Sequence, residues 1–485
     1  MKIPKEVIEI INELEKNKFQ AFIVGGCVRD ILQKRKPNDW DIATSALPDQ
    51  IAKLFPKNYT DNKFGTVKVL TRSSDESLKE IEITTFRTEE KYTDKRHPDK
   101  VAWAETIEAD LSRRDFTINA IALTLKEKIW KIIDSFEGQK DLKDKIIKAV
   151  GLPDHRFKED ALRLMRAIRL AAALDFTIEQ KTLKAIKENA DLLKHVSQER
   201  IRDELIKLIM SKNPVSGIEL LRETDLIKYV IPELMEGYKV GQNKHHLFDV
   251  YEHSLKSLDY AAKQNYNQYV RFSALLHDVA KPRTKAGQGK DSTFYGHEML
   301  GAKMTKSILT RLRFPNKDIE KITKLVRYHL FYYDAQEVTE SSVRRLLLNV
   351  GKENLQELFE LRTCDRIGSG CPKAIPYKLR HFLYIVEKVS LDPIDSRKLK
   401  VDGKDIMNLL SIQPGPKIGW IVNILLAEVL DDPKTNNKKI LEEKIKELGV
   451  LKDSDLEKLA KNAKSRVSQV IEKRDEMTKQ KYWVT

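Results

Sequence analysis

The spacing of apolar and polar positions changes about a third of the way along the chain. Ile8, Ile11 and Leu14 recur at helical spacing, which predicts an amphipathic helix within residues 1–20. Across residues 22–133, short apolar runs bounded by turn residues alternate with a few helical stretches, a pattern typical of a compact α/β domain. The strands predicted there are residues 21–24, 40–43, 66–71 and 80–86.

After Gly151, long stripes of Leu, Ile and Ala at helical spacing replace the strand pattern. A chain of 485 residues is too long to fold around one hydrophobic core. We therefore expect an α+β multidomain protein, with a small α/β head followed by a mostly helical neck, body and tail. The predicted domains are residues 1–140 for the head, 141–236 for the neck, 237–375 for the body and 376–485 for the tail.

Composition argues against a membrane protein and against a secreted one. With 41% hydrophobic and 33% charged residues, the chain has the balance of a soluble protein rich in amphipathic helices. It has no apolar run long enough to span a membrane, and its first residues lack the apolar core of a signal peptide. Three scattered cysteines are too few for a disulfide framework or a cysteine zinc site. These features predict a cytoplasmic protein with no membrane partner.

The charge balance favours a polyanionic partner. The formal net charge is +15 and the pI is about 9.3. Basic proteins bind nucleic acid by neutralising phosphates and releasing counterions. Solvated helix faces also carry lysine, so charge alone leaves a protein without a nucleic-acid ligand as an alternative.

A pair of glycines followed by a pair of aspartates is the strongest chemical signal in the chain. If Asp39 and Asp41 lie on a strand, its period of two aims both carboxylates at one face. Two such charges are costly unless a cation lies between them, and Mg²⁺ prefers carboxylate oxygens plus substrate phosphates. Gly25 and Gly26 let backbone N–H groups approach a triphosphate. The pattern predicts metal-assisted phosphoryl or nucleotidyl transfer; an exposed acidic strand end is the alternative.

Two further clusters suit a nucleotide. In Arg113-Arg114-Asp115, arginine can bind phosphate in a bidentate manner and the carboxylate can accept a hydrogen bond from a ribose hydroxyl. The alternative for this cluster is a capped helix start with surface arginines. Asp160 and Arg163 are three residues apart, so in a helix they would share one face, and Glu159 could fix the guanidinium. An ordinary surface ion pair is the alternative there.

Taken in order, these motifs resemble those of the class II tRNA nucleotidyltransferases (CCA-adding enzymes) and the bacterial poly(A) polymerases, whose head is similar to that of DNA polymerase beta. The resemblance extends over roughly residues 20–235. The matching pieces are Gly25-Gly26, Asp39-x-Asp41, Arg113-Arg114-Asp115, Glu159-Asp160-x-x-Arg163 and Ser197-Gln198-Glu199-Arg200-Ile201.

This resemblance implies a head that carries the metal site, a neck that reads the nucleotide, and a body and tail that grip tRNA. It implies that Asp39 and Asp41 are catalytic and hold Mg²⁺, that CTP and ATP are the substrates, and that the tRNA 3′ end is the acceptor. The implied nucleotide-binding residues are Gly25, Gly26, Arg29, Arg114, Asp115, Asn119, Asp160, Arg163, Arg166 and Arg169.

The assignment of Asp160 and Arg163 to base reading also has a chemical argument. Cytosine and adenine both present an amino donor beside a ring-nitrogen acceptor, in the same order. A carboxylate that accepts and a guanidinium that donates therefore fit both bases. Guanine and uracil present the reverse order and would leave buried groups unpaired.

Two features of the head refine this prediction. The polar stretch Glu89–Pro98 predicts a surface loop. The resemblance implies that a loop at this place switches the site from adding C to adding A. Its presence therefore argues against an enzyme that adds only CC. Glu82 is a candidate third carboxylate, and a solvent-facing strand residue is the alternative.

A second series of histidines and aspartates lies in the predicted body. It resembles the HD phosphohydrolase superfamily over about residues 242–370, with His253, His277, Asp278 and Asp365 as the implied core ligands. Imidazole and carboxylate together suit a divalent transition metal such as Mn, Ni or Co, which activates water for phosphate-ester hydrolysis. His297 and His329 match extra histidines of some members, and Lys281 is a candidate phosphate contact. A purely structural HD fold is the alternative.

The sequence therefore predicts template-independent addition of C, C and A to tRNA by a Mg²⁺-dependent nucleotidyltransferase, with an additional HD phosphohydrolase activity. Three alternatives stay open: an A-adding enzyme that works beside a separate CC-adding enzyme, a poly(A) polymerase, and a phosphohydrolase whose head mainly binds RNA. The sequence leaves open the HD substrate and the oligomeric state.

Overall fold

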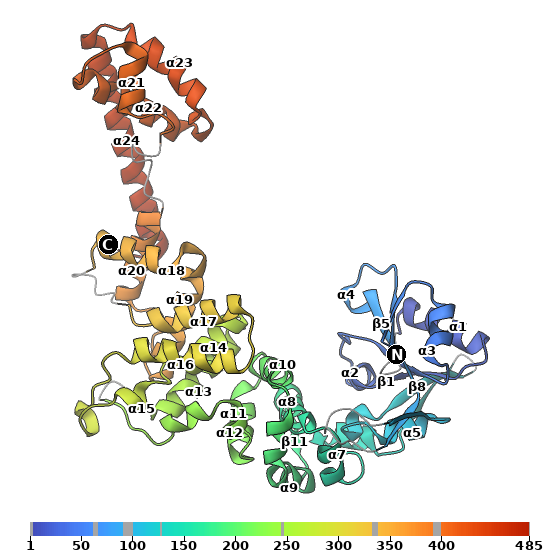
Figure 1. Ribbon diagram of the computed structural model, residues 1–485. Helices are drawn as coiled ribbons and strands as arrows, with labels where there is room; N and C mark the ends of the chain where they lie inside the picture. Colours follow the sequence, from blue (N-terminus) through green and yellow to red (C-terminus); the bar gives the residue numbers. More distant parts are fainter. Residues whose placement is uncertain are drawn as a thin grey trace. The chain divides into compact units, whose positions relative to one another are not determined.

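The computed structural model describes residues 3–61, 66–90, 100–126, 129–243, 247–331, 338–390 and 399–484. Its internal contacts divide the chain into two compact units. Figure 1 shows the chain coloured by residue number from blue to red. The first unit comprises Met1–His329 and Gln356–Pro372, and the second comprises Leu330–Leu355 and Lys373–Thr485. The predicted fold class is confirmed: a mixed α/β head precedes a mostly helical remainder. The finer division at residues 140, 236 and 375 stays a prediction.

A seven-stranded mixed sheet with the order β3-β4-β5-β2-β1-β8-β9 forms the centre of the head. Within it, β2 and β5 pair in parallel and the other neighbours pair antiparallel. The four strands predicted from the sequence are all present as β1, β2, β4 and β5. The strand bounds are β1 Ala21–Val24, β2 Asp41–Thr44, β3 Asn58–Asp61, β4 Thr66–Leu70, β5 Glu80–Thr85, β8 Ala122–Lys126 and β9 Ile129–Ile133.

Both faces of this sheet are covered, and alternate strand residues point to opposite cores. Ile23 packs in a core with helix α1 (Lys5–Lys16), whereas its neighbours Phe22 and Val24 pack in a second core with α5 (Ile107–Ser112). The predicted N-terminal helix is present as α1. Its buried stripe is Val7, Ile10, Ile11 and Leu14, and Ile8 is only half-buried.

The head also contains helices α2, α3, α4 and α6. Its strands β6 and β7 pair antiparallel as a hairpin that is separate from the seven-stranded sheet. Residues 91–99, which include most of the predicted loop Glu89–Pro98, lie between the hairpin strands and outside the described residues. The bounds are α2 Gly26–Leu32, α3 Pro48–Leu54, α4 Glu76–Lys79, α6 Gly138–Lys143, β6 Arg87–Glu90 and β7 Lys100–Trp103.

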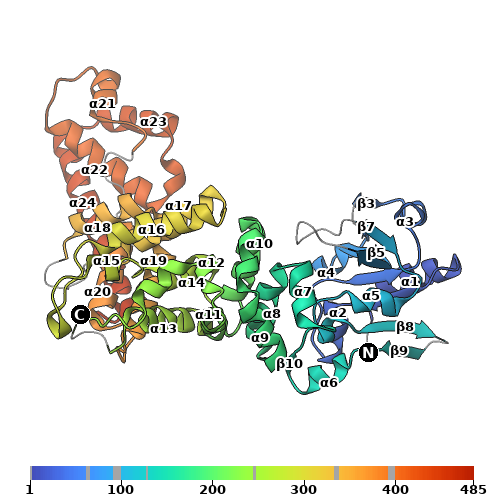
Figure 2. The same ribbon diagram turned by 60° about the horizontal axis from the view of Figure 1, so that its bottom comes forward.

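Beyond the head the first unit is helical except for a short parallel pair, β10 (Ile146–Ile147) with β11 (Thr177–Ile178). One continuous hydrophobic core joins the helices from α7 to α14 with α16 and α17, and Figure 2 shows these helices from a second side. Their bounds are α7 Pro153–Glu159, α8 Leu162–Leu174, α9 Gln180–Glu188, α10 Gln198–Ile209, α11 Pro214–Glu223, α12 Ile227–Val230, α13 Val250–Lys263, α14 Gln268–Leu276, α15 Lys281–Thr284, α16 His297–Arg311, α17 Asn316–Tyr328 and α19 Leu355–Gly368.

The second unit has its own core, in which Ile406, Ile421, Leu425, Leu441 and Ile445 are buried. Its helices are α18 Glu340–Val350, α20 Tyr377–Ser390, α21 Gly403–Leu410, α22 Pro416–Asp431, α23 Lys438–Gly449 and α24 Asp453–Tyr482. Among the described residues of both units, none of the helices has the length and apolarity needed to cross a bilayer.

Candidate functional sites

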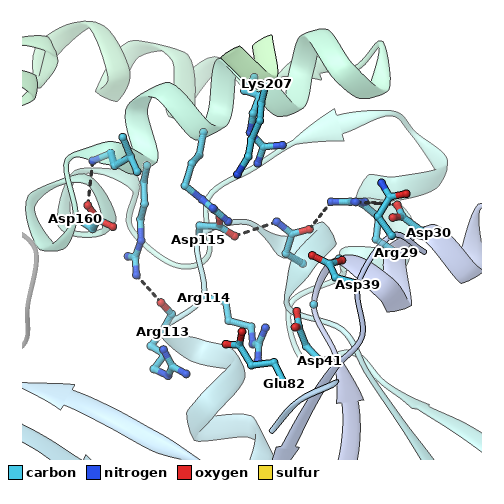
Figure 3. Close-up of a pocket in the computed structure, with 18 of the residues that line it drawn as sticks. Arg29, Asp30, Asp39, Asp41, Glu82, Arg113, Arg114, Asp115, Asp160 and Lys207 are labelled. Carbon is cyan, nitrogen blue, oxygen red and sulfur yellow. Dashed lines mark hydrogen bonds and ion pairs between the residues drawn. The ribbon is translucent and has the colours of Figure 1, made fainter. Parts of the chain in front are cut away.

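One polar cavity of about 750 Å³ in the first unit collects every residue predicted for the head and neck. Figure 3 shows its walls, which come from the head strands, the segment after α5 and helices α8 and α10. The predicted residues that line it are Gly25, Gly26, Arg29, Asp39, Asp41, Arg114, Asp115, Asn119, Asp160, Arg163, Arg166 and Arg169. Glu82, the candidate third carboxylate, also lines it.

Three carboxylates gather on one side of this cavity. Asp41 opens β2 and is the register partner of Glu82 in the parallel neighbour β5, so both side chains leave the sheet at the same level. Asp39 lies two residues earlier, before the strand begins rather than on it, yet its carboxylate lies close enough to that of Asp41 to interact with it, as Figure 3 shows. Burial, Asp39 and Glu82 together raise the pKa of Asp41 to about 7. The three carboxylates therefore repel one another, as the ligands of a cation site do before a cation binds.

Gly25 allows the strand-to-helix turn to pass close to this cluster. Its φ is 81°, and a Cβ there would lie 3.1 Å from Arg114 Nη1 and 3.3 Å from Asp41 Oδ2. A side chain would therefore strain the backbone and displace charged groups of the cavity. Gly26 begins α2, and the Arg29 guanidinium lies over it, 3.6 Å from where a Cβ would be.

A buried acid holds the two arginines of the second motif. Arg113 and Arg114 follow the end of α5, so the alternative of a capped helix start does not describe this segment. Asp110 Oδ1 accepts hydrogen bonds from Arg113 Nε and Nη2 at 3.0 and 2.8 Å, and Oδ2 accepts one from Arg114 Nη2 at 3.1 Å. Burial opposes ionisation of Asp110, yet the two guanidinium charges hold its pKa below the ordinary value. The sequence analysis missed Asp110, although its position three and four residues before the arginines is a local signal.

A chain of hydrogen bonds crosses the cavity wall from α2 to α8. Arg29 Nη1 donates to Asn119 Oδ1 at 3.0 Å, Asn119 Nδ2 donates to Asp115 Oδ1 at 3.1 Å, and Arg166 Nε donates to Asp115 Oδ2 at 2.8 Å. Asp115 is buried, which favours its neutral form, but Arg166 and Asn119 hold its pKa well below the usual range. Both oxygens of Asp115 are thus engaged by protein donors, and its predicted ribose contact stays a prediction.

Asp160 and Arg163 reach the cavity from different local positions. Asp160 is the residue after α7, and α8 begins only at Leu162, so the expected shared helix face is corrected. The Asp160 carboxylate accepts hydrogen bonds from Arg200 at 2.8 and 3.2 Å. The predicted contact between Glu159 and Arg163 is present, with Nη1 donating to Oε2 at 2.7 Å.

Helix α10 contributes two residues that line the cavity, Arg200 and Lys207, and a buried one behind it, Glu204, none of which was assigned a role from the sequence. Arg200 holds Asp160, and Glu204 Oε2 accepts a hydrogen bond from Arg169 Nε at 2.6 Å. Lys207 lies on the same side of the cavity in Figure 3. Arg200 belongs to a motif quoted for the family resemblance, which was the available signal. Glu204 is buried at 3% exposure, and only its partners in the fold reveal its place.

The second candidate site is a cluster of six buried side chains among the helices of the first unit. All six of the predicted ligand types meet there: His253 on α13, His277 and Asp278 after α14, His297 on α16, His329 after α17 and Asp365 on α19.

Asp278 lies between two pairs of histidines. Its Oδ2 is 3.1 Å from His253 Nε2 and 3.3 Å from His277 Nε2. Its Oδ1 is 3.3 Å from His297 Nε2 and 3.7 Å from His329 Nε2. The six side chains form two groups of three, each with ligand atoms within 4.8 Å of one another, and Asp365 completes the group of His253 and His277.

The histidine rings are oriented as metal ligands. Nδ1 of His277, His297 and His329 lies 2.9, 2.6 and 2.7 Å from the backbone oxygen three residues earlier. Because a carbonyl only accepts, each Nδ1 carries a hydrogen, and the Nε2 atom of each ring is the one that faces Asp278 and would bind a metal when deprotonated. Four imidazoles and two carboxylates converging in this way fit a divalent transition metal.

The charges of the cluster agree with that fit. Burial opposes protonation of His277, but Asp278 and Asp365 raise its pKa above the ordinary value. Burial and the charge of His277 lower the pKa of His329 to about 3. Lys281 is buried and its Nζ lies 2.6 Å from Asp278 Oδ2, so here it neutralises the carboxylate, and its predicted phosphate contact stays a prediction.

Three family descriptions match successive parts of the chain. Residues 21–148 match the Poly A polymerase head domain, residues 175–237 match the probable RNA and SrmB-binding site of polymerase A, and residues 250–367 match the HD domain. These matches fall on the head, on the helices that complete the cavity, and on the histidine cluster.

Curated proteins and solved structures match nearly the whole chain. The CCA-adding enzyme of Ligilactobacillus salivarius is 34% identical over 452 residues, which cover 92% of this chain and 96% of that protein. The CCA-adding enzyme of Lactococcus lactis is 34% identical and covers 92% and 99%. The crystal structure of the Bacillus stearothermophilus CCA-adding enzyme in complex with CTP is 28% identical, with a TM-score of 0.60 and coverage of 92% and 98%. The chain therefore belongs to the CCA-adding enzyme family of nucleotidyltransferases, and it carries an HD domain.

Proposed function

We propose that this protein adds C, C and A to the 3′ end of tRNA from CTP and ATP, without a nucleic-acid template, in the cytoplasm. The observation that carries the proposal is the single cavity in which a three-carboxylate cluster faces a wall of arginines. The near-complete coverage of CCA-adding relatives supports this function over poly(A) synthesis.

In this proposal Asp39 and Asp41 hold Mg²⁺ ions, with Glu82 beside them. The raised pKa of Asp41 fits such a role, because a bound cation relieves the repulsion among the three carboxylates. Mg²⁺ held by these carboxylates would supply charge that polarises the terminal 3′-hydroxyl of tRNA and neutralises the leaving pyrophosphate. Arg29, which Asn119 orients, would bind the triphosphate beside Gly25 and Gly26, and Arg114, which Asp110 orients, would place the ribose together with Asp115.

Base reading is assigned to Asp160 and Arg163. Arg200 fixes the Asp160 carboxylate and Glu159 fixes the Arg163 guanidinium. A fixed acceptor and a fixed donor suit the amino group and ring nitrogen that cytosine and adenine share. A base with the reverse order would bury unpaired groups, a penalty of about 1–3 kcal/mol for each.

The test uses three tRNA transcripts, which lack CCA, end in CC, or end in CCA, each incubated with labelled CTP or ATP. Incorporation of C into the first and A into the second is expected, with none into the third. An enzyme that adds A alone would label only the transcript ending in CC, and a poly(A) polymerase would extend all three with ATP. Asp41→Ala is expected to abolish both additions while tRNA affinity stays near that of the wild type.

We also propose that the histidine cluster is a phosphohydrolase site. The observation that favours it is the set of four Nε2 atoms directed at Asp278 in a buried cluster. Those residues would hold one or two divalent ions of Mn, Ni or Co, and the metal would activate a water molecule for hydrolysis. The test is release of phosphate from nucleotide 2′-monophosphates, or opening of 2′,3′-cyclic phosphates, by the Asp39→Ala protein with each metal. No release with any metal would favour a purely structural HD fold.

A further inference from the structure

An exposed aromatic and basic surface lies in the second unit, where α20 packs against the end of α24. Its members are Tyr377, Arg380 and His381 on α20 and Trp483 just after α24, and we name it the Trp483 surface. The end of the described chain lies beside α20 in both Figure 1 and Figure 2. Arg380 joins the two aromatic rings, because its Cζ is 5.9 Å from the centroid of Trp483 and 5.9 Å from that of Tyr377.

Packing alone does not explain this arrangement. The Trp483 side chain is 78% exposed and Tyr377 is 42% exposed, so neither ring fills a core. The backbone of Trp483 has a φ of 52°, in the left-handed region that bulky residues rarely adopt. Arg380 Nε and His381 Nδ1 are buried atoms, and neither has a hydrogen-bond partner among the residues that the structure describes. The unit thus presents a large ring to solvent and leaves polar groups beside it unsatisfied.

The charge around this surface is positive. Within the second unit, residues 373–386 include Lys373, Lys378 and Arg380 and no acidic residue. Asp475 on α24 also lies against α20, where it accepts a hydrogen bond from Tyr384 Oη and pairs with Lys388 Nζ at 3.6 Å. The nearest acid on the helix, Glu387, is already engaged by Lys481 Nζ at 2.6 Å and by Tyr482 Oη at 2.6 Å. Exposed aromatic rings flanked by cations are the usual platform on which proteins stack nucleobases, because the rings take the base and the cations take the phosphates.

We propose that the Trp483 surface stacks an unpaired base of the bound tRNA. The proposal rests on the proposed function for the identity of the RNA, and it adds a contact in the second unit that is separate from the nucleotide cavity of the first. Trp483 supplies the face for the base, Arg380 holds the ring by a cation–π contact and supplies charge to the adjacent phosphate, and Tyr377 extends the platform.

The test measures the Kd of the full-length protein for a tRNA transcript ending in CC at several salt concentrations. Stacking of one base predicts that Trp483→Ala raises the Kd by about 5- to 150-fold. Because this change removes no charge, the slope of log Kd against log salt is expected to stay unchanged. Arg380→Ala is expected to raise the Kd and to reduce that slope by about 0.7 to 0.9. Trp483→Phe keeps a stacking face and is expected to lose much less affinity.

Met477→Ala is the matched control, because Met477 is also exposed, at 63%, on the same helix. Thermal unfolding of each variant checks that the second unit stays folded, as expected for side chains that bury little area. A Trp483→Ala protein that binds tRNA like the wild type overturns the inference, as does an equal loss in Met477→Ala. A second readout separates this from the active site: Trp483→Ala should raise the KM for tRNA and leave kcat at saturating tRNA unchanged. Absence of nucleotide addition by the wild-type protein would instead refute the proposed function.

Discussion

Replacing Asp41 with asparagine is expected to stabilise the metal-free head while abolishing nucleotide addition. The carboxylate of Asp41 has an ordinary pKa of 3.8 but titrates near 7 in the folded protein, because of burial and the charges of Asp39 and Glu82. Above pH 7 the Asp41 carboxylate is therefore ionised in the folded protein, although its surroundings disfavour the ionised form. Asparagine has nearly the same shape and no charge, so it removes that cost.

The size of the effect follows from the two pKa values. Their difference corresponds to about 4 kcal/mol at most, since each pKa unit is worth 1.36 kcal/mol. The folded state binds the proton more tightly than the unfolded state, so wild-type stability falls as pH rises from about 4 to about 7. The advantage of Asp41→Asn should grow over the same interval and then remain constant. For a domain of this size we expect a rise in midpoint of about 5 °C or more at pH 8.

The assay is differential scanning calorimetry of wild type and variant at pH 5, 6, 7 and 8 in a chelator, followed by the same scans in Mg²⁺. Mg²⁺ is expected to stabilise the wild type more than the variant, because only a state that binds the ion gains from it. Asp75→Asn is the control: hydrogen bonds from Lys36 and Ser77 lower the pKa of Asp75 to about 2, so its ionised form is favoured and the change should not stabilise. A destabilised Asp41→Asn head, or a difference that does not vary with pH, would refute the reasoning.

Three further changes test other parts of the first unit. Gly25→Ala forces an unfavourable φ and crowds Arg114, so we expect at least about a tenfold loss of kcat/KM for CTP and ATP in steady-state assays. Gly151→Ala is the matched control, because its φ of 68° is also positive but its Cβ would meet open space, and it should keep the activity. Asp110→Asn leaves two partly buried guanidinium groups without the anion that pairs them and should lower the free energy of unfolding by about 3 kcal/mol in urea titrations; an unchanged midpoint would contradict this. Asp278→Ala should abolish metal binding by the histidine cluster in calorimetric titrations with Mn²⁺ or Ni²⁺ while nucleotide addition continues, and full metal binding would show that the cluster is not the site.

Sequence spacing predicted the parts of the site that are local along the chain. The strand before Gly25 followed from periodicity, and the contact between Glu159 and Arg163 followed from a spacing of four residues. Asp39 and Asp41 both line the cavity as predicted, although only Asp41 lies on the strand that the period of two assumed. The helix boundary at Asp160 was predicted wrongly, because the polar residues before Arg163 continue a helical pattern although the backbone leaves the helix there.

Pairing between distant segments was beyond the sequence. Arg200 reaches Asp160 across 40 residues, and Glu204 reaches Arg169 across 35. Such partners are chosen by the packing of α8 against α10, and no spacing rule within one helix encodes them. The histidine cluster was predicted because its residue types are rare together, but the central place of Asp278 between two histidine pairs is a property of the fold alone.

The two units are interleaved along the chain, since Leu330–Leu355 belongs to the second unit and Gln356–Pro372 returns to the first. No single truncation can therefore separate the two units. A truncation after His329 removes Asp365 from the histidine cluster. A truncation after Pro372 removes α20, whose Lys388 forms an ion pair with Glu340 of α18 at 3.3 Å. During synthesis the histidine cluster lacks the Asp365 carboxylate until the ribosome has made the whole inserted segment Leu330–Leu355 and then α19. A nascent chain therefore has no complete histidine cluster before the first segment of its second unit, Leu330–Leu355, has been made.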